Sequence, residues 1–393
     1  MKLTRPEISG AFADLGVLIP LEAALIAVNG LNPTSTLLGV GIVYIAAGWY
    51  FRLPMPVQPL KALAAIAIAR ELSPDVIAAG ALLMSLSLVV LAVSGAMDRV
   101  YAVIPIPVVR GIQLGLAYVL IRGAFNMLEK PLSPSVPQMT LSVGEVAVPV
   151  MLALAPLFLL GIALLVKKPI VPASLAVLAA GIAVGLYLGR WHGTSVLGPA
   201  PITPSVPGIG AFGTAAAVLL TAQLPLTIAN SVIATTDAAR MYFPDQAHRV
   251  TPRRLSLSIA LSNLWAGLFG GLPSCHGSGG LTAHYKMGAR SPLATTLLGV
   301  ILIALAILFG SAAQSVRTLV PLPFFGVLLL FVGVQHAALA LNVERRSDLG
   351  YVALAGVMAV LFDGNLAYAG ALTLCVYWAL QGLQRLAPTA RAA

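Results

Sequence analysis

The residue types and spacing that could do chemistry are concentrated in Leu272–Arg290. This stretch is too polar and too rich in glycine for an ordinary membrane span, although long apolar segments surround it. Helix-breaking residues and small polar side chains alternate at its start. They are Pro273, Cys275, His276, Gly277, Ser278, Gly279 and Gly280. A short helix is expected to begin at Ser278, and its first turn would present unpaired backbone N–H groups to an anion.

A second stretch, Leu53–Ala69, has the same layout. Leu53-Pro54 corresponds to Leu272-Pro273, a few extended residues follow, and a short helix is expected from Pro59. That helix would be roughly 18 Å long, about half a bilayer. Irregular backbone at membrane depth is tolerated only where it lines a cavity or is buried in protein. Two interrupted segments at corresponding places therefore predict the substrate site of a transporter.

Two such helix ends that face each other would make an anion site, because each presents N–H groups and the positive end of its dipole. Gly279 and Gly280 would let an oxyanion approach the backbone, and the Ser278 hydroxyl could donate a hydrogen bond. Pro59 suits a first helical position, and Gln58 before it offers an amide. The alternative is that the glycines serve only close helix packing.

Lys61 is an unusual cation, because it falls in the first turn of the predicted helix and opposes its dipole. A charge inside the membrane is also costly. A bound anion would offset both effects, whereas the alternative is an ion pair with Asp14 or Glu22 in the first segment. These two carboxylates could instead carry a coupling proton, or serve as packing partners or lie at the membrane edge.

Gln223 and Asn230 recur at helical spacing in the eighth segment and could line the same cavity. The alternative for both is hydrogen bonding between helices. His276, His284 and Cys275 have no zinc-like spacing, so no metal site is predicted. No phosphate-binding loop is visible, which argues against transport driven by ATP, and no cofactor is expected.

The composition is that of a polytopic, all-α membrane protein. The chain of 393 residues is 59% hydrophobic and 9% charged, with a mean hydropathy of +0.95, whereas soluble domains carry about 25% charged residues. No removable signal peptide is expected. Fourteen apolar segments are predicted, at 11–30, 34–51, 57–70, 75–96, 104–126, 146–166, 170–189, 211–236, 254–271, 277–288, 292–312, 320–341, 349–362 and 366–384. The third and tenth are too short to cross a bilayer.

The basic residues predict the orientation. The net charge is +10, but Lys and Arg lie in short loops, where they act as topology signals and do not indicate nucleic-acid binding. If the N-terminus is cytoplasmic, most of them fall on the inner side, including Arg240, Arg249, Arg253 and Arg254 before the ninth segment. This bias predicts a multi-pass protein of the cytoplasmic membrane with both termini inside.

The two halves of the chain are predicted to be repeats, because three proline-containing stretches match in the same order. Pro20-Leu21 matches Pro225-Leu226, Leu53-Pro54 matches Leu272-Pro273, and Ile104–Pro107 matches Val320–Pro323. Seven segments per repeat is an odd number, so the second copy would be inverted. The predicted fold is two inverted seven-segment repeats, with half-helices in segments 3 and 10 that short extended stretches precede.

Four stretches carry a resemblance to a known family. PMPVQPLKALAA (Pro54–Ala65) and LPSCHGSGGLTAHYKMGAR (Leu272–Arg290) resemble the signature stretches of molybdate transporters related to the sulfate permeases. EISGAFADLG (Glu7–Gly16) and QLPLTIANSVIA (Gln223–Ala234) are similar to that family's first and eighth segments. The sequence departs at Ser278, where the family is expected to have alanine, and at Glu22, where an apolar residue is expected.

This resemblance implies the fold of the uracil permease and sulfate permease superfamily, with a core domain and a gate domain. The core would comprise residues 1–100 and 205–315, which hold segments 1–4 and 8–11. The gate would comprise residues 101–200 and 316–393, which hold segments 5–7 and 12–14. A cytoplasmic regulatory domain after the last span is not expected. The resemblance also suggests a homodimer formed through the gate.

We therefore expect a secondary transporter for a tetrahedral oxyanion, with molybdate as the first candidate, that moves its core against its gate and can be proton-coupled. A sulfate transporter with the same site is one alternative. A nucleobase or carboxylate permease is another, although a base site would usually need a carboxylate where Gln223 and Asn230 lie. An anion channel also remains, whereas a membrane enzyme is disfavoured because no nucleophile–base set is apparent.

Overall fold

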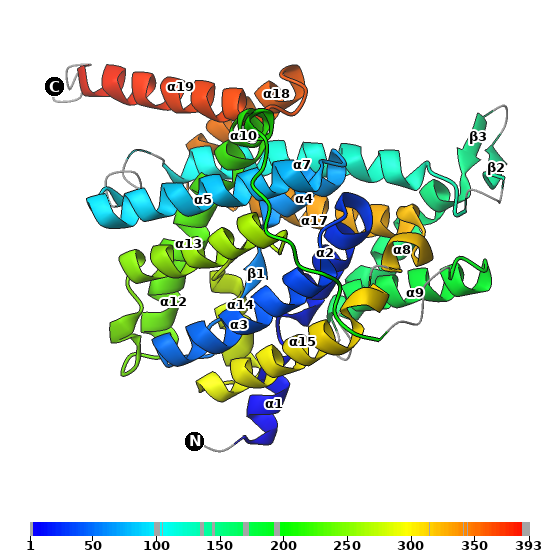
Figure 1. The fold of residues 1–393 in the computed structure, drawn as a ribbon. Helices are drawn as coiled ribbons and strands as arrows, with labels where there is room; N and C mark the ends of the chain where they lie inside the picture. Colours follow the sequence, from blue (N-terminus) through cyan, green and yellow to red (C-terminus); the bar gives the residue numbers. More distant parts are fainter. Residues whose placement is uncertain are drawn as a thin grey trace.

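A computed structural model describes residues 3–97, 103, 105–133, 137–143, 146–167, 173–191, 197–313, 315–340, 342–343 and 345–386. The first half contains α1 (Arg5–Ala11), α2 (Leu15–Asn29), α3 (Pro33–Phe51), β1 (Gln58–Pro59), α4 (Lys61–Ala69), α5 (Pro74–Ser94), α7 (Ile106–Leu128), β2 (Thr140–Val143), β3 (Val146–Pro149), α8 (Val150–Lys167) and α9 (Ala173–Tyr187). The structure is mostly helical, as predicted (Figure 1).

The second half repeats this helical character. It contains α10 (Ile209–Ala215), η1 (Ala216–Leu220), α11 (Thr221–Leu226), η2 (Thr227–Ile233), α12 (Ala234–Tyr242), η3 (Ala247–Arg249), α13 (Pro252–Phe269), β4 (Ser274–Cys275), α14 (Ser278–Lys286), α15 (Pro292–Ala313), α16 (Val316–Leu319), α17 (Leu322–Ala340), η4 (Arg346–Asp348), α18 (Leu349–Leu361) and α19 (Leu366–Leu386). Each of the fourteen predicted segments coincides with helix in the described residues. Seven helical spans there are long and apolar enough to cross a membrane unaided, which confirms a multi-pass membrane protein.

Local sequence signals explain where several helices begin and end. The Asn32 side chain accepts a hydrogen bond from the backbone N–H of Ser35 at 3.0 Å, and Pro33 occupies the first turn of α3. Just before it, Gly30 ends α2 with a φ of 74°, a left-handed conformation that suits glycine. The chain therefore passes from α2 to α3 through Gly30, Leu31 and Asn32 alone.

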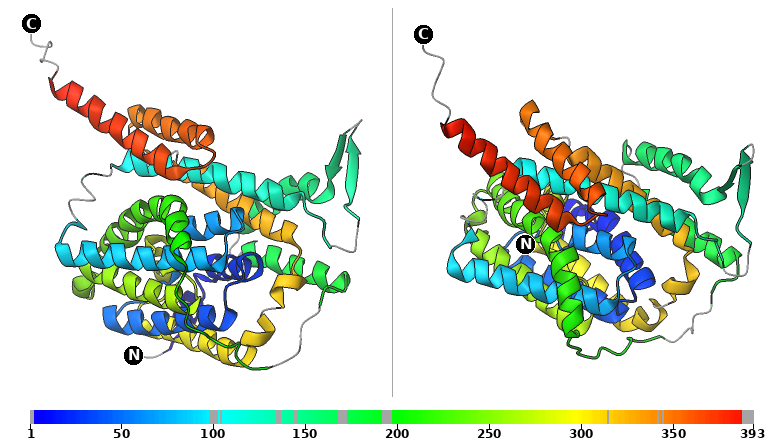
Figure 2. Two further views of the ribbon diagram at one scale, coloured as in Figure 1. Left: turned by 45° about the horizontal axis from the view of Figure 1, so that its top comes forward. Right: turned by 90° about the horizontal axis from the view of Figure 1, so that it is seen from above.

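The helices form two groups of neighbours. In one group α3 packs on α15, α13 packs on α5 and α3, and α12 packs on α14. In the other, α7 contacts α17, α18 and α19, while α17 also contacts α9. Figures 1 and 2 show α7, α18 and α19 along one side of the molecule and α3 and α15 along the other. The short helix α4 joins the groups, because it contacts both α5 and α7.

The two interrupted stretches meet through a pair of very short strands. β1 and β4 pair antiparallel, with Gln58 opposite Cys275 and Pro59 opposite Ser274. The Leu60 N–H extends the pairing by donating to the carbonyl of Pro273 at 2.8 Å. The expected helix start at Pro59 is therefore wrong, because Pro59 belongs to the strand and α4 begins at Lys61.

The eighth segment is less regular than its helical spacing suggested. Pro225 lies inside it and cannot donate a backbone hydrogen bond. Two π-helical stretches, η1 and η2, flank the α-helical turn that contains this proline. Such wide turns are frequent at functional sites. They change the direction in which side chains such as Gln223 and Asn230 leave the helix.

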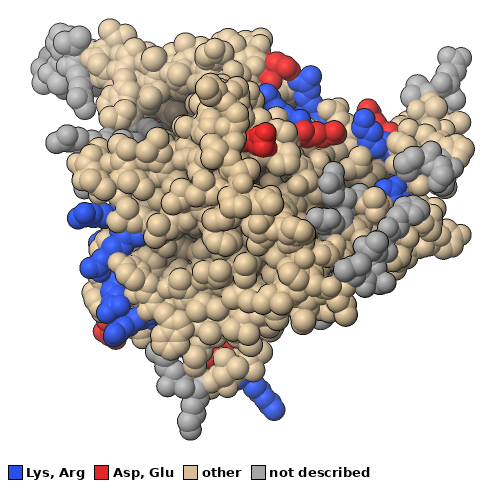
Figure 3. Space-filling view, viewed as in Figure 1, with Lys and Arg blue, Asp and Glu red and all other residues tan. Residues whose placement is uncertain are grey.

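Charged side chains concentrate at the ends of the helices. Figure 3 shows Lys and Arg gathered along the edge where α12 and α13 lie, and a mixture of basic and acidic residues near the region where α4 and α7 approach each other. Arg240, Arg253 and Arg254 are exposed at the first of these places. In this view the surface between the two places is almost uncharged, as a lipid-facing surface requires.

Candidate substrate-binding site

The starts of both short helices open into one cavity of about 480 Å³. Lys61 and Ala62 of α4 line it, as do Ser278 and Gly279 of α14. The remaining walls come from α2, the eighth segment, β4, α7 and α17. Their lining residues are Gly16, Val17, Pro20, Leu21, Arg110, Gln113, Gln223, Leu226, Asn230, Ser231, Ala234, Cys275, Leu328, Phe331, Val332, Gln335 and His336. The two sequence stretches that predicted a site thus reach the same space.

Backbone N–H groups remain available at both helix starts. In α14 the N–H groups of Gly280 and Leu281 donate to the Gly277 carbonyl at 3.0 and 3.2 Å. Those of Ser278 and Gly279 have no partner among the described residues. In α4 the N–H groups of Lys61 and Ala62 are likewise without a partner in the part of the chain described. Four donors at two positive helix ends make a site suited to an anion.

The three glycines around the start of α14 have different surroundings. A Cβ atom at Gly277 would lie 2.5 Å from Oε1 of Gln58, and one at Gly280 would lie 2.6 Å from Cβ of Pro56. Both positions therefore need glycine for close packing. A Cβ atom at Gly279 would meet nothing within 4 Å, because this residue faces the cavity. The packing interpretation thus fits Gly277 and Gly280, whereas the anion interpretation fits Gly279.

Gln223 and Asn230 line the cavity and also make hydrogen bonds between helices. Oε1 of Gln223 accepts from the backbone N–H of Leu63 at 2.9 Å and so caps α4 from a neighbouring helix. Oδ1 of Asn230 accepts from the Ser278 hydroxyl at 2.9 Å. That bond engages the Asn230 amide oxygen and does not use its NH₂ group. Both sequence interpretations of these side chains are therefore compatible with their geometry.

Lys61 lines the cavity without a carboxylate partner. The ion pairs found among the described residues join His284 to Asp14 and Arg122 to Asp363. None of them includes Lys61, so the predicted alternative of a pair with Asp14 or Glu22 is not formed. Glu22 is only 2% exposed, and neither of its carboxyl oxygens has a hydrogen-bond partner in the described part.

Asp14 lies behind the helix ends in a buried hydrogen-bond network. Nε2 of Gln58 donates to it at 2.7 Å, the Tyr44 hydroxyl lies 3.3 Å away, and Nε2 of His284 lies 3.1 Å away. Nδ1 of His284 must donate to the Gly10 carbonyl, at 2.7 Å. If His284 is neutral, its Nε2 therefore carries no proton. A hydrogen bond between Nε2 and Asp14 then needs one further proton, which the two side chains share.

Several predicted contacts lie outside the cavity lining. Gln58 and Pro59 hold the strand pair and the Asp14 network. Nδ1 of His276 donates to the Pro56 carbonyl at 2.8 Å, and its Nε2 accepts from the Ser258 hydroxyl at 2.8 Å. Gly277 and Gly280 are packed as described above. These residues position the helix starts, whereas Lys61, Ser278, Gly279, Gln223 and Asn230 reach the cavity.

Sequence analysis missed the polar residues that α7 and α17 bring to the cavity. Arg110 and Gln113 come from α7, and Gln335 and His336 come from α17. The treatment of Lys and Arg together as topology signals in short loops overlooks Arg110, which lies inside the predicted apolar segment 104–126. A charge within a span is itself a signal of function, and the glutamine three residues later lies on the same helix face. His284 was likewise considered only as a metal ligand, and no group of His, Cys, Asp and Glu suited to a metal occurs in the described residues.

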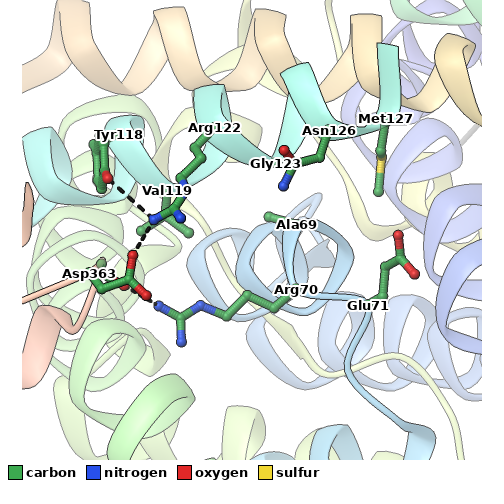
Figure 4. Close-up of a pocket in the computed structure, with 11 residues that line it drawn as sticks. Ala69, Arg70, Glu71, Tyr118, Val119, Arg122, Gly123, Asn126, Met127 and Asp363 are labelled. Carbon is green, nitrogen blue, oxygen red and sulfur yellow. Dashed lines mark hydrogen bonds and ion pairs between the residues drawn. The ribbon is translucent and has the colours of Figure 1, made fainter. Parts of the chain in front are cut away.

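A second cavity, of about 450 Å³, lies between the end of α4, α7 and the turn after α18. Figure 4 shows how its charges lie. Arg122 forms an ion pair with Asp363, and Arg70 donates to the Asp363 backbone carbonyl at 3.0 Å. The Arg122 guanidinium also lies 3.4 Å from the Tyr118 hydroxyl. Here the basic side chains already have protein partners.

Two broken helices that meet at a cavity inside a helical membrane protein define a membrane transporter. The family described as "Molybdate transporter of MFS superfamily" matches residues 6–120 and 215–335. Molybdate transporter 2 of Arabidopsis thaliana is 31% identical over 383 residues, which cover 87% of this chain and 80% of that protein. Molybdate transporter 1 of Arabidopsis thaliana is 30% identical over 431 residues, which cover 95% of this chain and 88% of that protein. The chain therefore belongs to the molybdate transporter family.

Solved structures share the fold at low sequence identity. The transmembrane domain of the cyanobacterium bicarbonate transporter BicA superposes with a TM-score of 0.68 at 15% identity, over 93% of this chain and 98% of that one. The murine anion transporter Slc26a9 in its inward-facing state gives a TM-score of 0.68 at 13% identity, over 98% of this chain and 70% of that one. Family and fold are those of a transporter and not of an enzyme.

Proposed function

We propose that the protein is a secondary transporter for a tetrahedral oxyanion, with molybdate as the preferred substrate. One observation carries this proposal: four backbone N–H groups from two helix starts share a cavity with the ammonium of Lys61, and none of these groups has a partner among the described residues. The names of the relatives point to molybdate among the oxyanions. Sulfate transport through the same site is the second candidate, because sulfate carries the same double charge.

The charges around the cavity favour an anion over a cation or a nucleobase. In the part of the chain that the structure describes, its lining includes Lys61 and Arg110 but no Asp or Glu. A desolvated cation attracts a divalent anion strongly in such surroundings. A base would instead need hydrogen-bond acceptors as well as donors, and the acceptors Oε1 of Gln223 and Oδ1 of Asn230 are already engaged.

Transport would follow an elevator mechanism, in which a core moves the anion against a gate. The core would comprise residues 1–100 and 205–315, and the gate residues 101–200 and 316–393. The separate packing of α3, α5, α13 and α15 and of α7, α17, α18 and α19 supports this division. The antiparallel pairing of β1 with β4 supports the inverted repeats, because the equivalent strands of the two halves run in opposite directions there.

Proton coupling would involve the shared proton of Asp14 and His284. Asp14 accepts a hydrogen bond from Gln58, whose backbone precedes α4. It also lies against the start of α14, because a Cβ atom at Gly280 would lie 2.8 Å from Oδ1 of Asp14. A change in its protonation would therefore alter the packing of both helix starts. Glu22 is a second candidate, because it is buried and neither of its carboxyl oxygens has a hydrogen-bond partner among the described residues.

The function is tested by uptake of radiolabelled molybdate into proteoliposomes, with and without an inward proton gradient. Saturable uptake with counterflow, inhibited only weakly by excess sulfate, is expected. If sulfate inhibits the uptake as strongly as unlabelled molybdate does at the same concentration, the result would favour the sulfate transporter. Uptake that does not saturate and shows no counterflow would identify an anion channel. No uptake of either anion by folded protein would refute the proposal.

Orientation and assembly are further parts of the proposal. We place both termini in the cytoplasm and expect a homodimer through the gate in the cytoplasmic membrane. The cytoplasmic side can be tested by labelling the loop before α13. Gln246 is exposed in this loop, whereas its neighbour Ala247 is buried, so Gln246 is the labelling site. Gln246→Cys, in a Cys375→Ala background, should resist impermeant thiol reagents in right-side-out cells. Mass measurement in mild detergent should give twice the chain mass, whereas a monomer would contradict the dimer.

A further inference from the structure

The cavity has a second polar wall, to which the proposed function assigns no contact with the anion. It consists of Arg110 and Gln113 on α7 together with Gln335 and His336 on α17. These two helices pack against each other. They belong to the group of helices that includes α18 and α19, and not to the group that contains α3, α13 and α15. The anion cavity is therefore bounded by polar residues from both groups.

Arg110 brings a positive charge to this wall without a carboxylate to balance it. One guanidinium N–H donates to Oε1 of Gln113 at 2.9 Å. The Arg110 Nε is buried and has no hydrogen-bond partner among the described residues. No ion pair of Arg110 occurs there either. A buried donor that lacks a partner costs free energy, which suggests that a ligand completes the set.

His336 adds a second incomplete polar group to the same wall. Its side chain is 7% exposed, and Nδ1 has no hydrogen-bond partner in the described part of the chain. His336 lies four residues before the end of α17, and Arg110 lies four residues after the start of α7. The antiparallel course of these two helices brings the side chains to the same end of the pair. Both then face a cavity whose other wall holds Lys61 and Ser278.

We propose that Arg110 and His336 form the second half of the oxyanion site. The guanidinium fork binds two oxygens of the tetrahedral anion, and the imidazole supplies a further N–H. Arginine suits this task because its planar donors match such oxyanions in pairs. Gln113 positions the guanidinium through its hydrogen bond. This inference rests on the proposed transport of an oxyanion and assigns it a second set of contacts.

A site divided between two groups of helices has a consequence for transport. Contacts from α4 and α14 would travel with the anion if those helices move, whereas contacts from Arg110 and His336 would stay behind. The two-sided site then binds tightly in one position and more weakly in the other. Removal of the Arg110 charge should therefore weaken binding and accelerate release of the anion from the position in which Arg110 contacts it.

The test compares four variants with wild-type protein in detergent, by titration with sodium molybdate and by uptake into proteoliposomes. Arg110→Gln removes the charge, and Arg110→Lys keeps the charge but removes the fork. Gln113→Glu keeps Arg110 and neutralises it with a new ion pair, so it tests the charge even where Arg110→Gln fails to fold. Arg253→Gln is the matched control, because it removes an exposed arginine from α13 that lies outside the cavity.

Loss of one charge-assisted contact should weaken binding by about 10- to 150-fold in Arg110→Gln and Gln113→Glu. The molybdate affinity of Arg110→Lys should lie between those of these variants and wild type. The affinity of Arg253→Gln should stay within about twofold of wild type. Wild-type affinity in Gln113→Glu or in folded Arg110→Gln would overturn the second half-site and leave the proposed function intact. If wild type and Arg253→Gln bind neither molybdate nor sulfate, the proposed function itself fails, and this inference fails with it.

Discussion

The central cavity and the cavity shown in Figure 4 have similar volumes, about 480 and 450 Å³, and two Lys or Arg side chains line each of them. They differ in whether those charges are already paired. Arg122 and Arg70 both bond to Asp363, whereas in the described part of the chain Lys61 has no ion-pair partner and Arg110 has only a neutral glutamine. Volume and basic composition therefore do not identify an anion site. The availability of donors does.

Solvent strengthens this difference. The side chains of Arg122 and Asp363 are 55% and 81% exposed, so water and salt screen their charges. Gly279 and Lys61 instead open into a cavity with walls from Leu21, Leu328 and Phe331. An anion loses more hydration there but gains stronger interactions with each donor. The central cavity should therefore control affinity, while the other should not.

The largest loss is expected for Lys61→Gln, which removes the unpaired charge at the start of α4. Molybdate affinity should fall by about 10- to 150-fold, because a charge-assisted contact is lost. Arg70→Gln, at the opposite end of the same helix, is the matched control and should leave affinity within about twofold. If Asp14→Asn restores transport to Lys61→Gln, the lysine neutralises a carboxylate and does not attract the anion.

A smaller loss is expected for Gln223→Leu, which removes the cap that accepts from the Leu63 N–H. Loss of such a cap costs about 0.5–2 kcal/mol, which corresponds to about 2- to 30-fold if the cost appears in binding. Titration calorimetry and thermal unfolding measured on the same sample would separate the two effects. Unchanged affinity together with unchanged stability would show that this hydrogen bond has no energetic role.

At the second cavity, Asp363→Asn should change molybdate affinity by less than about twofold. The residue has a φ of 50°, a conformation that asparagine also tolerates, so the substitution removes charge without straining the backbone. The test is the same calorimetric titration, with Lys61→Gln as the positive control. A loss as large as that of Lys61→Gln would erase the distinction between paired and unpaired cavities.

The smallest effect concerns pH. The hydrogen bond and the charge of Arg122 lower the pKa of the Asp363 carboxyl below its usual value. A carboxyl group with a depressed pKa contributes stability above its unfolded pKa, and this contribution is lost as the pH falls through the folded pKa. The difference in unfolding temperature between wild type and Asp363→Asn should thus be constant from about pH 5 to 8 and shrink below about pH 4. A difference that changes near neutral pH would assign the titration to another group.

The sequence predicted the parts of this molecule that depend on local breaks in regular structure. Pro54 and Pro273 precede two stretches that are extended and then helical, and α14 begins at Ser278 as expected. The family predicted from the signature stretches is confirmed by the comparisons. These features leave strong local signals, because proline fixes φ and lacks a backbone N–H donor, whereas glycine allows conformations and close approaches that other residues rarely permit.

The parts that depend on contacts between distant segments were not predictable. Pro59 forms a strand and not a helix start, because it pairs with Ser274 of β4, which lies 215 positions later in the chain. Gln223 caps α4 across 160 positions, and His284 reaches Asp14 across 270. Arg110 resembled a loop residue because charge alone does not show which way a side chain points. Only the packing of α7 on α17 brings it to the cavity.

The central claim is that the anion binds against the backbone N–H groups at the start of α14, and Gly279→Ala tests it most directly. The added methyl group meets no protein atom within 4 Å, and alanine favours a helix over glycine by about 1 kcal/mol. Gly213→Ala in α10 is the matched control, since its Cβ also meets nothing within 4 Å and Gly213 lies outside the cavity. Calorimetric titration with molybdate should show at least about a 10-fold loss for Gly279→Ala and none for Gly213→Ala, with both proteins at least as stable as wild type. Equal molybdate affinity in Gly279→Ala and wild type would place the anion elsewhere and contradict the account.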